Sequence, residues 1–245
     1  MRNFKIVVEY DGTAYCGWQR QKNGISIQQV LEEKICLITC EKVKVIGSGR
    51  TDAGVHAWNQ VASFRSITRL PAEIIHRGVN GLLPPDIVVK KIEEVPAEFH
   101  PQYDARGKVY LYRICNRRLR PALGRNYCWF VHYPLDLAAI KQAAEYLIGR
   151  YDFSCFCATG SSVKDRTRTV QDVSINTGDD GLLEITIEAQ GFLRCMVRNI
   201  VGTLVEIGRG RRKPGEMKEI IDSRNRNAAG ATAPARGLYL KEVKY

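Results

Sequence analysis

Residues 49–57 read Gly-Arg-Thr-Asp-Ala-Gly-Val-His-Ala, and this stretch constrains the fold and chemistry of the chain more than any other. Its two glycines, Gly49 and Gly54, allow the backbone to turn sharply and to approach a ligand closely. Arg50 lies two residues before Asp52. One loop can therefore hold a guanidinium that binds phosphate together with a carboxylate that acts as nucleophile or base. The alternative is a surface turn in which Asp52 bonds only to its own backbone.

Length and charge narrow the class of protein. The 245 residues are 44% hydrophobic, which is enough for a sizeable core in one domain or two smaller ones. The formal net charge of +11 predicts a polyanionic partner, most simply a nucleic acid. The alternative is a generally basic surface that serves solubility.

The positive charge is concentrated in one segment, residues 106–125, which contains seven Lys or Arg residues and no acidic ones. Tyr110 and Tyr112 are interleaved with these basic residues. Basic side chains that alternate with aromatic ones suit a surface that neutralises phosphates and stacks bases. A second basic concentration lies at Arg209–Lys213.

The eight cysteines and four histidines lack the spacing of a metal site, because there is no Cys-x-x-Cys and the closest pair is Cys155 and Cys157. Cys36, Cys115 and Cys128 lie in apolar runs, where a free thiol behaves as a small hydrophobic group. We therefore expect a reduced, cytoplasmic protein without a bound metal. No apolar stretch is long enough to span a membrane, and no signal peptide precedes the first strand.

Periodicity predicts mixed secondary structure in the first half. Ser26 and Gln29 form a capping-box pattern that predicts a helix after Ser26, and Pro71 predicts a second helix that ends near Gly81. Alternating or β-branched runs predict strands over residues 4–10, 43–46, 60–64 and 86–92.

The second half has the same character. Helices are expected after Asp136, from Leu193 to a terminating Gly208, and after Pro214. Strands are expected over residues 109–115, 127–131, 170–175, 182–187 and 237–243, with a hairpin turn at residues 178–181. The sequence therefore predicts an α+β fold: two α/β-mixed halves, 1–105 and 106–245, around a largely antiparallel sheet.

The stretch at residues 49–57 resembles the catalytic loop of the tRNA pseudouridine synthase A family. Further blocks resemble that family in the same order along nearly the whole chain, which makes a chance match very improbable. These blocks are Tyr10-Asp11-Gly12, Gly17–Gln21, Val79-Asn80, Leu83–Ile87, Lys108–Arg113, Met196–Gly202 and Gly237–Leu240.

The resemblance implies a pseudouridine synthase fold with an active-site cleft between the two halves. It implies an isomerase that converts uridine to pseudouridine at positions 38 to 40 of the anticodon stem-loop of tRNA. The reaction is redox-neutral, so no cofactor is required. A homodimer, in which one tRNA touches both subunits, is also implied.

Roles for individual residues follow from the same resemblance. Asp52 is expected to be the nucleophile, Tyr110 to stack on the flipped uracil and move a proton, and Arg198 to pair with Asp52 and keep it charged. The alternatives are a core-edge tyrosine for Tyr110 and a solvated helix face for Arg198. The expected substrate contacts are Tyr110, Arg50, Arg20, Lys108 and Leu240. His56 is expected only to pack or hydrogen-bond, and Arg194 to add a phosphate contact.

Two other functions stay open at this point. A non-catalytic RNA-binding protein could use the basic strand and the loop around Trp18 as a stacking platform, but it gains nothing from a buried Asp52. A nucleoside or glycoside hydrolase usually needs a second carboxylate or a metal beside its first carboxylate, which here would be Asp52. The sequence does not distinguish attack on C6 of the base from attack on C1′ of the ribose.

Overall fold

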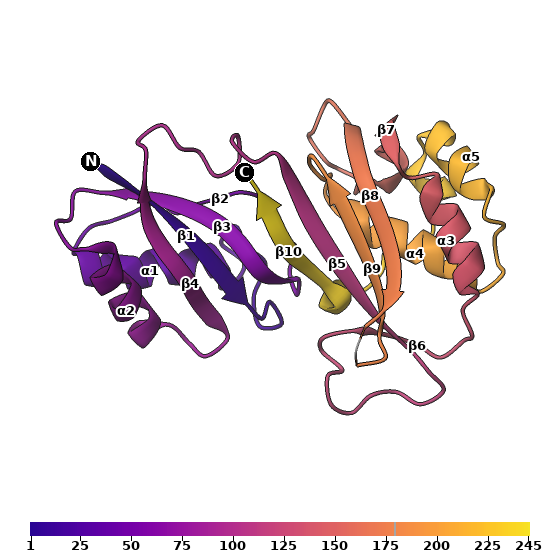
Figure 1. Cartoon of the computed structure of the whole chain (residues 1–245), viewed down its shortest axis with the longest axis horizontal. Helices are drawn as coiled ribbons and strands as arrows, with labels where there is room; N and C mark the ends of the chain where they lie inside the picture. Colours follow the sequence, from indigo (N-terminus) through magenta and orange to yellow (C-terminus); the bar gives the residue numbers. More distant parts are fainter. Residues whose placement is uncertain (179) are drawn as a thin grey trace. The chain divides into compact units, whose positions relative to one another are not determined.

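The computed structural model describes residues 1–178 and 180–245, which form two compact units (Figure 1). Unit 1 consists of Met1–Arg106 and Tyr239–Tyr245, and unit 2 consists of Gly107–Leu238. The structure differs from the predicted halves in the closing residues Tyr239–Tyr245, which belong to unit 1.

Unit 1 contains a sheet in the order β4-β1-β3-β10, with the short β2 beside β3. β1 pairs with β3 and β4 in antiparallel fashion, whereas β10 runs parallel to β3. The elements of unit 1 are β1 Arg2–Tyr10, α1 Ile27–Thr39, β2 Ile46–Gly47, β3 His56–Ser66, α2 Ala72–Leu82, β4 Ile87–Val95 and β10 Leu238–Lys244.

The core of unit 1 lies between this sheet and two helices. Phe4, Ile6 and Val8 alternate along β1 and are completely buried. α1 and α2 pack against each other, and α2 also packs against β4 (Figure 1). Burial of a side chain of this size contributes about 1.5–3 kcal/mol, so the alternation fixes the register of β1.

The predicted capping of α1 is confirmed, since the Ser26 hydroxyl accepts a hydrogen bond from the Gln29 N–H over 3.3 Å. The strand predicted at residues 43–46 is wrong for most of its length. There, side chains of α1 bind the backbone of Val45. Gln28 Nε2 donates to the Val45 carbonyl over 2.9 Å, and the Val45 N–H donates to Glu32 Oε1 over 3.1 Å. Only Ile46 and Gly47 pair with β3.

Unit 2 contains a second run of strands in the order β5-β9-β8-β7, in which every neighbouring pair is antiparallel. β6 runs parallel to the end of β5. The elements of unit 2 are β5 Gly107–Asn116, β6 Trp129–Val131, α3 Leu137–Glu145, β7 Gly149–Asp152, β8 Thr167–Thr177, β9 Leu183–Ala189, α4 Met196–Gly208 and α5 Glu216–Ser223, with short 3-10 turns at Ser154–Phe156, Arg226–Ala228 and Ala235–Gly237.

α4 is the most deeply buried helix of the chain's described part, and α3 packs against both α4 and α5 (Figure 1). The predicted cap of α3 is confirmed, because Asp136 Oδ1 accepts from the Ala139 N–H over 3.0 Å. α4 ends at Gly208, as predicted, but the left-handed residue that follows the helix is Gly210, with φ of +70°. Gly208 is helical, and a side chain there would collide with Ile140.

The predicted fold class, α+β around a largely antiparallel sheet, is confirmed. The predicted hairpin of β8 and β9 is also confirmed by their antiparallel register. Within its turn, Asp179 lies outside the described residues. No helix among residues 1–178 and 180–245 is long and apolar enough to cross a membrane.

Candidate active site

Residues 49–55 form a loop between β2 and β3 that presents Asp52, and the last two residues of the stretch 49–57 begin β3. The Val55 N–H donates to the Asp52 carbonyl over 3.1 Å, and Gly54 between them has a φ of +76°. This tight turn leaves the Asp52 side chain half-buried and that of Arg50 exposed. The loop is therefore more than a solvated surface turn.

Buried polar side chains hold the loop to the sheet beneath it. Gln60 of β3 is completely buried; its Nε2 donates to the Gly49 carbonyl over 3.0 Å and its Oε1 accepts from the Ser48 hydroxyl over 2.8 Å. The hydroxyl groups of Tyr10 and Thr51 lie 2.8 Å apart in a buried hydrogen bond. Such fully satisfied networks fix one backbone geometry, so the position of Asp52 is well determined.

The loop that follows β1 lies against the backbone of Asp52. The Trp18 N–H donates to the Thr51 carbonyl over 3.1 Å. Gly17, with φ of +90°, allows this approach, because a Cβ there would lie 2.5 Å from the same carbonyl oxygen. The resemblance includes both this loop and the Asp52 loop, but it does not indicate the contact between them.

Arg20 is held by a pair of side chains from α1. Its NH1 donates to Glu32 Oε2 over 3.0 Å, and its backbone N–H donates to Gln28 Oε1 over 2.8 Å. The Arg20 side chain remains 53% exposed. The ion pair uses only part of the five-donor guanidinium, so Arg20 can still present N–H groups to a phosphate.

Leu240 and His56 lie where β10 meets the end of the loop. Leu240 is opposite Ala57 in the parallel register and is completely buried. The buried His56 ring stacks on Tyr239 with centroids 4.8 Å apart. Its Nδ1 lies 3.1 Å from the Gly12 nitrogen and 3.0 Å from Asp11 Oδ1, so it accepts from one or donates to the other, depending on the tautomer. These contacts fit the expected packing role.

In unit 2, Lys108 and Tyr110 lie on the same face of β5, two residues apart. Burial lowers the pKa of Lys108 to about 8. Tyr110 is 8% exposed, and its ring meets that of Phe192 edge-to-face, with centroids 4.9 Å apart and planes at 80°. Phe192 was not expected from the sequence, because it lies outside every short block on which the family resemblance was based.

Arg198 lies near the start of α4, between the buried Val197 and Asn199, and is itself half-buried. Its Nε donates to the Ala233 carbonyl over 2.7 Å. Burial raises the pKa of the Tyr112 hydroxyl, and the nearby guanidinium of Arg198 opposes this rise. Tyr112 and Tyr110 lie on the same face of β5, and Arg198 lies near Tyr112. Arg198 is therefore at that face and is not a fully solvated charge.

The basic segment is only partly available for a polyanion. Arg113 pairs with Glu184 over 3.2 Å and with Asp180, which neutralises its charge. By contrast, the exposed arginines of the loop after β5 are Arg117, Arg118, Arg120 and Arg125. Arg194 is exposed as well, at the entry to α4.

The structure thus gathers the expected residues into two sets, one in each unit. Unit 1 holds Asp52, Arg50, Arg20 and Leu240, whereas unit 2 holds Lys108, Tyr110 and Arg198. Each of the eight cysteines, all in the described part of the chain, carries a free thiol. Among the described residues, no group of three or more His, Cys, Asp or Glu side chains could hold a metal ion.

Comparison with known proteins identifies this combination of fold and loop. The family model for tRNA pseudouridine synthase matches residues 6–104 and 143–245. The chain therefore belongs to the tRNA pseudouridine synthase family, and it is an isomerase that acts on uridine in tRNA. Asp52 and Arg198 lie within the matched ranges, whereas Lys108, Tyr110 and the arginine-rich loop lie outside them.

Within that family the chain is similar over its full length to enzymes of the A type. It is 49% identical to the tRNA pseudouridine synthase A of Thermoanaerobacter sp. (strain X514), with 100% of each chain covered. It is 46% identical to the tRNA pseudouridine synthase A 2 of Clostridium perfringens, again over 100% of each, and 45% identical to the tRNA pseudouridine synthase A of Myxococcus xanthus, covering 100% of this chain and 92% of the relative. A solved structure titled "Crystal Structure of a Cbf5-Nop10-Gar1 Complex" is similar at 15% identity and a TM-score of 0.39, over 97% of this chain and 48% of that chain.

Proposed function

We propose that Asp52 is the nucleophile of a pseudouridine synthase that modifies the anticodon stem-loop of tRNA at positions 38 to 40. The observation that carries this proposal is the fixed loop around Asp52, whose backbone is hydrogen-bonded by Trp18 and Gln60 and whose side chain stays half-buried. A carboxylate in a rigid, partly dehydrated loop is prepared for attack on a bound uridine.

The reaction rearranges one nucleotide without net oxidation. Asp52 attacks either C6 of the uracil or C1′ of the ribose, the N1–C1′ bond breaks, and the uracil reorients. A C5–C1′ bond then forms, the bond to Asp52 breaks and regenerates the carboxylate, the proton on C5 is lost, and N1 gains a proton. The base must leave its stack to be reached, which costs a few kcal/mol and is compensated by contacts in the site.

Tyr110 and Arg198 support the chemistry in this proposal. The Tyr110 ring, braced edge-to-face by Phe192, offers a flat surface for the flipped uracil and a hydroxyl that moves a proton. Arg198 pairs with Asp52 and keeps it charged in a water-poor site. Arg50, Arg20 and Lys108 bind the RNA backbone, and Leu240 contributes an apolar contact.

Two further parts of the proposal follow from the resemblance to the tRNA pseudouridine synthase A family. The first is a homodimer in which one tRNA contacts both subunits. The second is a cytoplasmic location, where the tRNA substrate is found. Sedimentation of the purified chain with and without tRNA tests the first part. Localisation of a tagged copy in cells tests the second.

The test is incubation of uridine-labelled tRNA transcript with the chain, without added metal, followed by nucleoside analysis and mapping of the modified positions. Pseudouridine at positions 38 to 40 is the expected product. Tight tRNA binding without pseudouridine would instead indicate a non-catalytic RNA-binding protein. Release of free uracil would indicate a hydrolase.

A further inference from the structure

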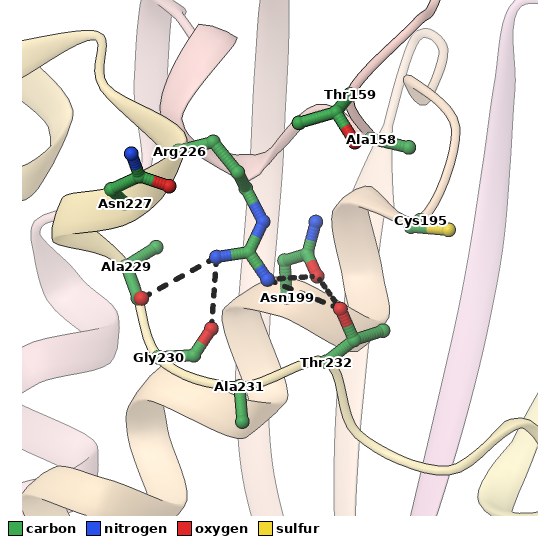
Figure 2. A pocket seen from close by; sticks show the side chains of 10 residues that line it. All are labelled: Ala158, Thr159, Cys195, Asn199, Arg226, Asn227, Ala229, Gly230, Ala231 and Thr232. Carbon is green, nitrogen blue, oxygen red and sulfur yellow. Dashed lines mark hydrogen bonds between the residues drawn. The ribbon is translucent and has the colours of Figure 1, made fainter.

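Arg226 stands at the centre of a hollow of about 460 Å³ in unit 2 (Figure 2). Its NH1 group donates to the carbonyls of Ala229 and Gly230 over 3.3 and 3.0 Å. Its NH2 group donates to Asn199 Oδ1 over 3.0 Å and to the Thr232 hydroxyl over 3.1 Å. One guanidinium thus binds three points of the segment 229–234, which we call the strap, and one point of α4.

All four acceptors of Arg226 are neutral oxygens, and no acidic side chain in the described part of the chain forms an ion pair with it. Hydrogen bonds from a charged donor are stronger than those between neutral groups and are strongly directional. Here these hydrogen bonds fix the geometry of the strap. The planar fork of arginine suits this task, whereas a lysine would satisfy fewer of the acceptors.

The strap is fixed to α4 along its length. The Gly230 N–H donates to the Thr203 hydroxyl over 2.9 Å, and the Ala231 N–H donates to Glu206 Oε1 over 3.2 Å. The approach is so close that a Cβ on Gly202 would lie 1.7 Å from the Ala231 carbonyl oxygen. Asn199, completely buried, accepts from both Arg226 and Thr232 and donates to the Phe156 carbonyl over 2.8 Å.

The far end of the strap contacts Arg198 and Tyr112, which lie at the face of β5 that carries Tyr110. Ala233 and Arg198 are joined twice: the Ala233 N–H donates to the Arg198 carbonyl over 3.1 Å, and Arg198 Nε donates to the Ala233 carbonyl over 2.7 Å. The next carbonyl, that of Pro234, accepts from the Tyr112 hydroxyl over 2.7 Å. The direction of the Arg198 guanidinium therefore depends on where the strap places the Ala233 carbonyl.

We propose that Arg226 is a positioning residue, which sets the orientation of Arg198 through the strap. The proposal rests on the proposed role of Arg198 beside the nucleophile. Arg226 itself touches neither substrate nor reacting atoms. Its loss releases the strap, the Ala233 carbonyl moves, and the Arg198 guanidinium loses the contact that aims it. Misplacement by about 1 Å can lower a rate on the order of 100-fold.

The test compares Arg226→Met, Arg226→Lys and the control Arg224→Met in single-turnover pseudouridine formation. Arg224 lies two residues away and is 69% exposed, so its variant is expected to keep the wild-type rate. Arg226→Met is expected to lose about 10- to 100-fold in kcat, with KM for tRNA within about 2-fold. Arg226→Lys is expected to recover only part of the loss, because it keeps the charge without the fork.

A double-mutant cycle with Arg198→Met shows whether Arg226 acts through Arg198. Once Arg198 is gone, adding Arg226→Met is expected to lower kcat by less than about 3-fold. Full multiplication of the two losses, or wild-type kcat in Arg226→Met, would overturn the proposal. So would a loss confined to KM, since that would place Arg226 in RNA binding.

Amide hydrogen exchange separates this proposal from the role of Arg198. In Arg226→Met the amides of Gly230 and Ala233 are expected to exchange at least 10-fold faster, while amides of β1 are unchanged. If Arg198→Met turns over at the wild-type rate, the proposed role of Arg198 fails, and the exchange data still report on the strap. If Arg226→Met does not fold, Thr232→Val removes only the two hydrogen bonds of the Thr232 hydroxyl, one from Arg226 and one to Asn199, and is expected to give the same changes at smaller size. Unchanged exchange in whichever variant folds would overturn the proposal.

Discussion

The N–H of Trp18 donates to the carbonyl of Thr51 over 3.1 Å, so the loop after the first strand is bonded to the backbone next to Asp52. This contact exists only because Gly17 brings the two segments together at a positive φ without a side chain between them. The position of Asp52 is thus set by a residue 35 positions earlier in the sequence.

Gly17→Ala is expected to destabilise the chain by roughly 2 kcal/mol or more, because it forces Cβ into the left-handed region and against the Thr51 carbonyl. Gly81 in α2 is the matched control, since a Cβ there meets no atom within 4 Å and its substitution by Ala should be neutral or slightly stabilising. Thermal unfolding of both variants checks this. Equal melting temperatures would mean that the Gly17 contact does not constrain the loop.

Asp52→Asn is expected to abolish pseudouridine formation while tRNA affinity stays within a few-fold of wild type. The amide has nearly the same size as the carboxylate but is far less nucleophilic. Single-turnover nucleoside analysis and a tRNA-binding titration measure the two quantities separately. Substantial remaining turnover would exclude Asp52 as the nucleophile.

tRNA binding is expected to become weaker as pH rises through about 8, because burial lowers the pKa of Lys108 to that value and its charge is then lost. Lys108→Arg, which stays charged, should bind tRNA equally well at pH 7 and 9. Binding titrations at both pH values, at fixed salt, provide the measurement. Identical pH dependence in wild type and Lys108→Arg would remove Lys108 from phosphate binding.

The same shift predicts the pH dependence of stability. In the folded chain Lys108 releases its proton near pH 8, whereas in the unfolded chain it does so near pH 10.4. Between these values the unfolded state binds more protons, so the contribution of Lys108 to the free energy of unfolding rises with pH. Comparison with Lys108→Met isolates this contribution. A difference between the two chains that does not vary from pH 8 to 10 would contradict it.

The exposed loop after β5 is expected to bind phosphates. Replacing Arg117 and Arg118 together by Ala should weaken tRNA binding and reduce the slope of log K against log salt by roughly 1–2, because each phosphate contact contributes about 0.7–0.9. Lys141 and Lys218, exposed on α3 and α5, provide a charge-matched control pair. Equal slopes for wild type and the Arg117/Arg118 variant would place the loop away from the RNA.

Arg198→Met is expected to fold and bind tRNA yet lose most of its activity, because similar length and apolar packing are kept while the charge is removed. Arg198→Lys should retain more activity than Met but less than wild type, since it lacks the planar fork. Rates at saturating tRNA measure this without interference from binding. Wild-type turnover of Arg198→Met at pH 7 would make Arg198 only a structural partner of Ala233.

Local signals predicted the elements whose stability is largely their own. The Ser26–Gln29 cap of α1, the Asp136 cap of α3 and the hairpin of β8 and β9 depend on residues close in sequence, and all three are present. The strand expected at residues 43–46 failed because Gln28 and Glu32, distant in sequence, occupy the Val45 backbone groups. A period-2 pattern carries no information about such competitors.

The same limit applies to the site. The proposed site residues Asp52, Arg198 and Tyr110 could be named from motifs. Gln60, which holds the Asp52 loop, and Phe192, which contacts Tyr110, could not, and the motif that contains Gly17 does not show its contact with the Asp52 loop. The strap was invisible because residues 229–234 are small and have no periodicity, and Arg226, Thr203 and Glu206 supply its order through side chains. Residues that position a functional group act across elements, so their signal lies in the fold rather than in the local sequence.

The return of β10 to unit 1 has a consequence for biosynthesis. A ribosome completes all of Gly107–Leu238 before it makes Tyr239–Tyr245, so β3 lacks its partner β10 until the whole of unit 2 has been synthesised. During that interval β3 offers an open edge next to the nascent Asp52 loop, and such edges invite pairing with foreign strands. Completion of the sheet beside the Asp52 loop is thereby deferred until the second unit has been synthesised.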